Sequence, residues 1–217
     1  RGLCMKQDSI IGNITEVINR YEKGTIFSIH EFYHLGTKNT VKSAILRLEN
    51  RGEIERLVDG LYIKPKYSEV LKEFSYPTID ELANKIAKKF SWTICPGEDN
   101  ALNMLGLSTQ IPNAYVYLSD GPYRMYEYRG RKIIFKHSSN RYISEYSRNL
   151  SLIIQAIKSL GLENINENVI EKLALFAYKN ISEDISLNTN KLPHWIFNVI
   201  VLINKKVKQY GSNDKLE

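Results

Sequence analysis

Apolar residues in the first fifty positions recur at the spacing of one helical face in three separate stretches. In the first stretch, residues 8–22, the apolar positions are Ile10, Ile11, Ile14, Val17 and Ile18. A second, shorter stretch follows Ser28, a good N-cap, and stops at Gly36. A third begins near Asn39 and places on one face Val41, Ala44, Ile45 and Leu48. The pattern predicts three helices that pack against each other through these apolar faces.

A β-hairpin is predicted directly after the third helix. Gly52 breaks the helix, residues 53–57 have the composition of a strand, and Asp59-Gly60 is a two-residue turn signal before residues 61–63. Three helices followed by a short antiparallel pair are typical of a winged helix-turn-helix domain. We therefore assign this fold to residues 1–75.

The polar side chains of the third helix face away from its apolar stripe. A recognition helix presents its N-terminal residues to the major groove, and cations on the wing neutralise phosphates. The predicted DNA-binding residues are Lys38, Asn39, Thr40, Lys42, Ser43 and Arg47 on the helix, with Arg56, Lys64 and Lys66 on or beside the wing. Similar folds also form protein-interaction modules that never touch DNA, so this alternative stays open.

The rest of the chain alternates helical and strand patterns. Residues 76–143 contain a helical pattern at 79–90, a helix at 97–107, a strand at 114–120 and a hairpin at 124–137 with its tip near Arg129-Gly130, which together predict a small α/β module. Residues 144–217 contain three further helical segments, predicted to pack on that module. The predicted fold class is α+β.

Composition is that of a globular protein, with 43% hydrophobic and 25% charged residues in 217. No apolar run reaches the roughly 18 residues that cross a bilayer. The first ten residues lack the apolar core of a secretory signal, and Cys4 and Cys95 form no CxxC motif. These features predict a cytoplasmic protein without a membrane partner.

The net charge of +6 is spread along the chain as +2, +3 and +1 over residues 1–75, 76–143 and 144–217. None of the three parts is strongly basic. DNA binding therefore depends on where the cations lie on the folded surface, and not on the total charge.

The stretch His30-Glu31-Phe32-Tyr33-His34 matches the zinc-protease pattern HExxH. Two histidines four residues apart on a helix can bind zinc while the glutamate activates water. The segment, however, is about two turns long, and the remaining histidines, His137 and His194, are distant in sequence. The alternative is a pair of partly exposed polar residues on a packed helix. We predict no catalytic residue, no metal, no cofactor and no enzyme activity.

The order of the segments resembles the AbiEi-type antitoxin family of type IV toxin-antitoxin systems, especially its shorter members. The matching pieces, within residues 37–137, are GLYIKPKY, ALNMLGLSTQIP, YLSDGPYR and IIFKH. The resemblance implies an autorepressor that binds inverted repeats of double-stranded DNA in its own promoter. It also implies a functional antagonist of a nucleotidyltransferase-like toxin, in many cases without a stable complex. The expected assembly is a monomer or a weak homodimer. The alternative function is toxin neutralisation by direct contact, without DNA binding.

A second basic cluster lies on the predicted hairpin, interleaved with tyrosines. Its members are Arg124, Arg129, Arg131, Lys132, Lys136 and Arg141. Aromatic rings stack on bases while cations meet phosphates, so the cluster is a candidate nucleic-acid or toxin surface. Ordinary strand alternation, with one face packed and one face wet, accounts for much of the same pattern.

Overall fold

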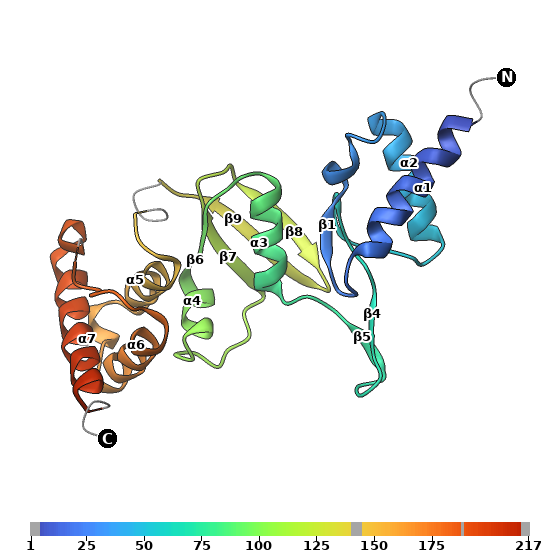
Figure 1. Ribbon diagram of the computed structural model, residues 1–217. Helices are drawn as coiled ribbons and strands as arrows, with labels where there is room; N and C mark the ends of the chain where they lie inside the picture. The colour runs from blue at the N-terminus through green and yellow to red at the C-terminus, as the bar shows by residue number, and fades with distance from the viewer. Residues whose placement is uncertain (1–4, 140–144, 188, 214–217) are drawn as a thin grey trace. The chain divides into compact units, whose positions relative to one another are not determined.

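The computed structural model describes residues 5–139, 145–187 and 189–213, and it confirms the α+β class (Figure 1). The described chain forms two compact units. The first holds the residues up to Ser91 together with Glu127–Arg129, and the second holds Trp92–Tyr126 and the residues from Gly130 onward. The predicted division into 1–75, 76–143 and 144–217 does not coincide with these units, because the helix after Pro77 lies in the first unit.

The first unit contains the first and third predicted helices and the predicted hairpin, with one added strand and a 3-10 helix in place of the second predicted helix. The helix α1 (Met5–Arg20) is followed by strand β1 (Ile26–Ser28), the 3-10 helix η1 (Ile29–Phe32), helix α2 (Lys38–Asn50) and strands β2 (Glu55–Val58) and β3 (Leu61–Ile63). The three strands form an antiparallel sheet in the order β1-β3-β2. The helices α1 and α2 and the hairpin are confirmed, whereas β1 is not predicted by the sequence pattern. The second predicted helix, after Ser28, is wrong: the chain forms only the 3-10 helix η1 there, because the Tyr33 and Leu35 N–H groups donate to the carbonyl oxygens three residues earlier.

The core of this unit is built by the predicted helical stripes and by an aromatic group around Phe27. Ile14 of α1 and Ile45 and Leu48 of α2 are buried in this core. The Phe27 ring lies 5.7 Å from Phe32 in an edge arrangement and 6.2 Å from Tyr62 in a stacked one, measured between ring centroids. These contacts join β1 to η1 and β3, and Phe27 is only 1% exposed.

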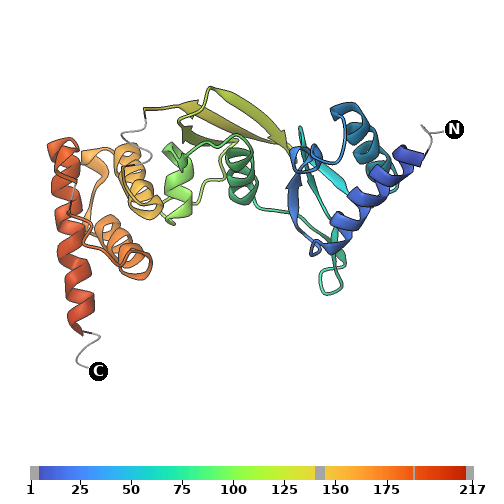
Figure 2. The same cartoon turned by 45° about the horizontal axis from the view of Figure 1, so that its top comes forward.

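Two further elements complete the first unit. A ribbon of strands β4 (Lys66–Ser68) and β5 (Glu73–Ser75) projects from it, as Figures 1 and 2 show. The helix α3 (Ile79–Lys89) starts with a capping box, in which the Thr78 side chain accepts from the Glu81 backbone and the Glu81 carboxylate accepts from the Thr78 backbone. The capping box fixes the start of α3 two residues after Pro77.

The second unit holds a four-stranded sheet and a helical group. The strands β6 (Ile94–Pro96), β7 (Ala114–Ser119), β9 (Arg131–His137) and β8 (Arg124–Tyr128) are ordered β6-β7-β9-β8, with β7 and β9 parallel, and β8 runs into the residues that belong to the first unit. Helix α4 (Glu98–Met104) connects β6 to β7. The predicted hairpin at 124–137 is confirmed.

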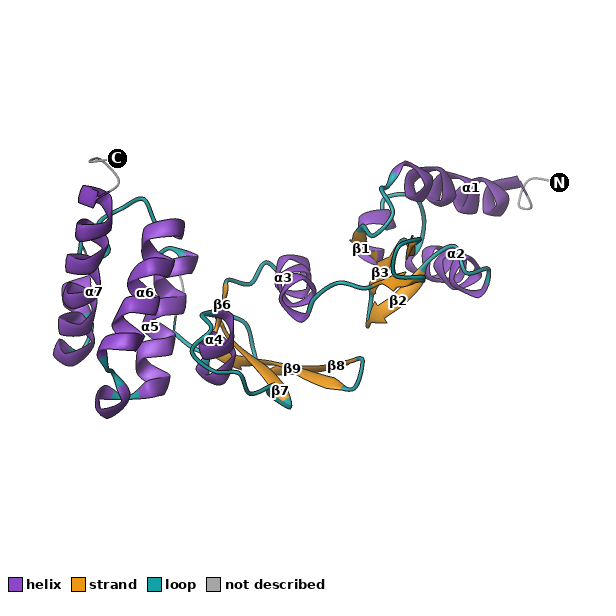
Figure 3. Ribbon diagram, turned by 90° about the horizontal axis from the view of Figure 1, so that it is seen from below, coloured by secondary structure: helices purple, strands orange, loops and turns teal. Residues whose placement is uncertain are grey.

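The helices α5 (Arg148–Leu160), α6 (Glu167–Asn180) and α7 (His194–Asn213) lie side by side (Figure 3). Two short 3-10 turns, η3 (Leu162–Asn164) and η4 (Thr189–Lys191), connect them. Their shared core includes Ile153, Leu173 and Ile200, each fully buried. No helix in the described part of the chain is long and apolar enough to span a bilayer.

Gly121 packs so closely on Trp92 that a larger residue cannot fit without displacement. A Cβ atom at this position would lie 2.3 to 2.5 Å from three atoms of the indole ring. We expect Gly121→Ala to lower the free energy of unfolding of the second unit by about 1–3 kcal/mol. Urea unfolding followed by tryptophan fluorescence measures this directly, because Trp92 and Trp195 both lie in that unit.

Gly12 provides the matched control for this substitution. It lies within α1, and a Cβ atom there would meet nothing within 4 Å. Gly12→Ala should stabilise α1 by about 0.5–1 kcal/mol, since glycine is a poor helix former. Because Gly12 lies in the first unit, amide hydrogen exchange along α1 measures this gain, and the tryptophan unfolding curve should not change. An unchanged tryptophan unfolding curve for Gly121→Ala would contradict the close packing of Trp92.

Candidate nucleic-acid interface

Helix α2 is fixed in place by its cap and by its buried face. Thr37 is the N-cap, and its Oγ1 accepts a hydrogen bond of 3.3 Å from the Thr40 backbone N–H. The buried residues are the predicted Val41, Ala44, Ile45 and Leu48. The helix thus starts at Lys38 rather than at Asn39, and its opposite side is left to solvent.

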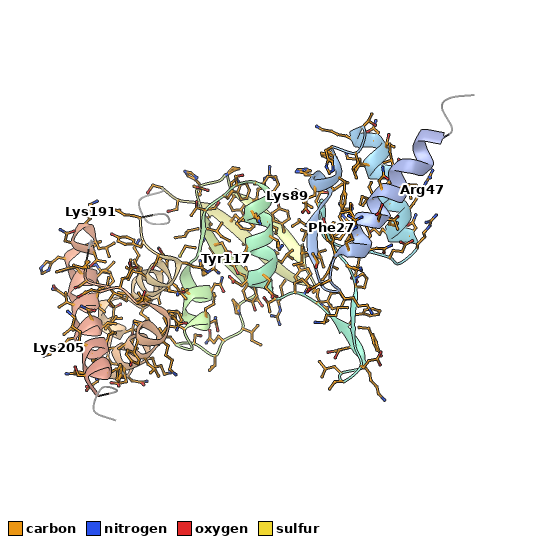
Figure 4. The ribbon with its side chains drawn as sticks, in the orientation of Figure 1. Phe27, Arg47, Lys89, Tyr117, Lys191 and Lys205 are labelled. Carbon is orange, nitrogen blue, oxygen red and sulfur yellow. The ribbon has the colours of Figure 1, made fainter. Side chains whose placement is uncertain are left out.

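The exposed side of α2 carries five of the predicted DNA-binding residues. These are Lys38, Asn39, Lys42, Ser43 and Arg47, and Figure 4 shows Arg47 on α2. The first turn contains no acidic residue, so the positive end of the helix dipole adds to the lysine charges. Thr40 differs from the others, because it is partly buried and its hydroxyl hydrogen-bonds the Thr37 hydroxyl at 2.7 Å.

Leu46 lies on the same exposed side and was not predicted as part of the site. It is 55% exposed, between Ser43 and Arg47 in the sequence. An apolar side chain on a recognition helix can pack on the methyl group of thymine. The signal in the sequence is that Leu46 does not fit the apolar stripe of residues 41, 44, 45 and 48.

Lys64 has a structural role that its sequence position does not indicate. Its Nζ donates to the carbonyl oxygens of Ile18, Asn19 and Tyr21 at 3.1, 2.9 and 2.8 Å. Cations satisfy the free carbonyls at the end of a helix in this way. We therefore assign Lys64 to the C-terminal end of α1 and do not carry it into the proposed interface.

The other two cations of the hairpin region remain on the surface. The Arg56 Nη2 donates to Asp59 Oδ1 at 2.6 Å, but its side chain is 49% exposed. An exposed ion pair of this kind contributes little to stability, so a phosphate can compete for the guanidinium. Lys66 is exposed at the start of β4.

The HExxH segment has a geometry that does not suit zinc. His30 lies in the four-residue 3-10 helix η1 and His34 lies beyond it, so the pair lacks the shared face of an α-helix. The Glu31 carboxylate accepts from the Ser28 N–H at 2.7 Å and the Tyr21 hydroxyl at 3.1 Å. No group of three metal-ligating side chains is found among the described residues.

We expect protein purified without chelator to contain zinc well below one equivalent. Elemental analysis measures this, and His30→Ala with His34→Ala is the comparison. Stoichiometric zinc that the double variant loses would contradict the structural role of the motif and reopen hydrolase chemistry.

The second basic cluster has its guanidinium groups on aromatic rings. Arg124 lies 5.4 Å from Trp92 and Arg129 lies 3.9 Å from Tyr76, measured to the ring centroid. Arg131 donates to the Tyr115 hydroxyl at 2.8 Å. Lys132 is exposed and Lys136 is partly buried, while Arg141 is outside the described residues. Arg129 belongs to the first unit, whereas Arg124, Arg131, Lys132 and Lys136 belong to the second.

Comparison with known protein families shows which family this chain belongs to. Residues 13–185 match the model of DUF6088, described as a family of unknown function. The match covers most of the chain, and the protein therefore belongs to this family. No curated protein matches the sequence.

Proposed function

We propose that residues 1–75 form a winged helix-turn-helix domain and that the protein is a DNA-binding repressor. The observation that carries the proposal is the exposed side of α2, where Lys38, Lys42 and Arg47 accompany hydrogen-bonding side chains. The α2 helix and the antiparallel β2-β3 pair with its Asp59-Gly60 turn support a recognition helix followed by a short wing. Arg56 and Lys66 are the proposed phosphate contacts beside the wing.

The proposed target is an inverted repeat upstream of the protein's own gene. Two copies of α2 that read two half-sites require about one helical turn of DNA, or a multiple, between the half-site centres. The resemblance to AbiEi-type antitoxins supports this target and adds a role against a nucleotidyltransferase-like toxin.

The testing experiment measures binding of the purified protein to the labelled upstream fragment and to a scrambled fragment over a salt series. Selective binding that weakens with salt is expected. Equal, weak binding to both fragments would refute the repressor and leave α2 as a scaffold element. The antitoxin role has its own test, which is rescue of growth when the neighbouring toxin gene is expressed.

A second candidate function, toxin neutralisation by direct contact, is favoured by the β4-β5 ribbon. Within ten residues, Val70 is 92%, Leu71 68% and Phe74 50% exposed. Apolar side chains gathered on a projecting ribbon are typical of a protein-contact site. If the neighbouring gene product co-purifies with the wild type but not with Val70→Ser and Leu71→Ser, direct contact is supported. If neither the wild type nor the variant forms a complex with the neighbouring gene product, direct contact is refuted.

A further inference from the structure

We propose that the DNA contact continues from α2 across η1 to the last turns of α3, where Lys85 and Lys88 bind the sugar-phosphate backbone beside the half-site. The inference rests on the proposed DNA binding and extends its footprint. It is carried by a cleft of the first unit, by the charges that line it and by the contacts that connect it to α2.

Helix α3 presents Lys85 and Lys88 on the side opposite its packed face, while Lys89 is partly buried. The buried residues are Leu82, Ala83, Ile86 and Ala87, while Lys85 and Lys88 are exposed. The acidic residues lie in the first turn, and the lysines gather toward the last. Lysines at a helix C-terminus also suit the helix dipole, so their placement alone does not define a binding site.

The lysines line a cleft in which the carboxylate of Glu31 already accepts two hydrogen bonds. The cleft has a volume of about 490 Å³ and is lined by the three lysines, β1 and η1 residues, Tyr21 and Leu61. Among the described residues that line it, Glu31 is the only carboxylate, and it accepts from the Ser28 N–H and the Tyr21 hydroxyl. The cleft therefore offers positive charge and hydrogen-bond donors to an anion.

A chain of contacts connects this cleft to the N-terminal end of α2. Lys89 Nζ donates to the Asp59 carbonyl oxygen at 2.8 Å, which holds the C-terminal end of α3 against the hairpin turn; Figure 4 labels Lys89 on α3. The His30 ring lies 5.1 Å from the Tyr33 ring, and Lys38 lies 5.9 Å from the Tyr33 centroid. Lys89 and His30 line the same cleft, and the ring contacts continue from His30 through Tyr33 to Lys38, so Lys89, His30 and Lys38 form one band.

Electrostatics within the band supports an anionic ligand. The pKa of His30 is lowered by burial, then by the nearby charges of Lys89 and Lys38. Repulsion reaches His30 from both ends of the band, from α3 and from α2. Phosphates along the band relieve this repulsion, and a duplex supplies them as a regular row. The row of phosphates along a duplex matches the length of this band better than a single small anion does.

The test compares the wild type with a double variant that carries both Lys85→Ala and Lys88→Ala. The matched control replaces Lys179 and Lys205, two exposed lysines of α6 and α7. Affinity is measured for the upstream and the scrambled fragment between about 50 and 200 mM salt. We expect the slope of log affinity against log salt to fall by about 2 for the double variant, because each lost phosphate contact removes about 0.9.

Loss of contacts to the sugar-phosphate backbone should weaken binding to both fragments equally, so the ratio of the two affinities should stay unchanged. An unchanged slope in a protein that still binds the upstream fragment would overturn the inference and leave the repressor intact. If the wild type binds neither fragment, the proposed function fails and the inference fails with it. A slope that falls equally in the control variant would show a general charge effect and would also overturn the inference.

Discussion

Replacing both Lys42 and Arg47 with alanine is expected to weaken binding to the upstream fragment by about 30-fold or more. Contacts of long cationic side chains to base edges or phosphates contribute about 1–3 kcal/mol each, and two lost contacts at the lower limit give this factor. Both side chains are exposed on α2 and neither is needed for its packing, which depends on the opposite face. The helix should therefore remain folded. Fluorescence anisotropy with the labelled fragment at fixed salt measures the loss.

Specificity separates this variant from a simple change in net charge. Binding to the upstream fragment should fall more than binding to the scrambled fragment, because a recognition helix reads base edges as well as phosphates. The Lys179 and Lys205 double variant has the same change in charge and should bind as the wild type does. Unchanged affinity in the Lys42 and Arg47 variant would remove α2 from the interface.

Most of the fold of the first unit follows from local signals in the sequence. The apolar stripes of α1 and α2, the Ser28 cap and the Asp59-Gly60 turn each act within a few residues, and the structure has all of them. Strand β1 could not be predicted because it is only three residues long and all three are buried, so it shows no alternation of apolar and polar positions. It is defined by pairing with β3, where Ile26 lies opposite Ile63, far along the chain.

The same difference between local signals and long-range contacts explains which residues of the site could be predicted. The exposed face of α2 is predictable because a helix has two sides and the apolar residues choose the buried one. The role of Lys64 is not predictable, since its partners at the end of α1 are 43 to 46 residues away. Membership of α3 in the first unit is likewise a matter of tertiary packing, and Pro77 alone indicates only where a new helix can start.

Phe27→Ala is expected to have the largest effect on stability, lowering the free energy of unfolding of the first unit by about 3–5 kcal/mol. The side chain is 1% exposed and contacts the rings of Tyr21, Phe32 and Tyr62. Truncation leaves a cavity at the point where β1, η1 and β3 meet. Because the tryptophans lie in the second unit, the loss is measured by amide hydrogen exchange along α2.

Phe27→Leu should lose clearly less stability, since it keeps most of the apolar volume. The Phe27 variants also separate folding from recognition. Phe27→Ala should reduce DNA affinity only through the fraction of unfolded protein, so that saturating DNA protects α2 again. The Lys42 and Arg47 variant should show the reverse, with wild-type exchange and weak binding. If Phe27→Ala left the α2 amides as protected as in the wild type, the packing of Phe27 would not contribute to the stability of α2.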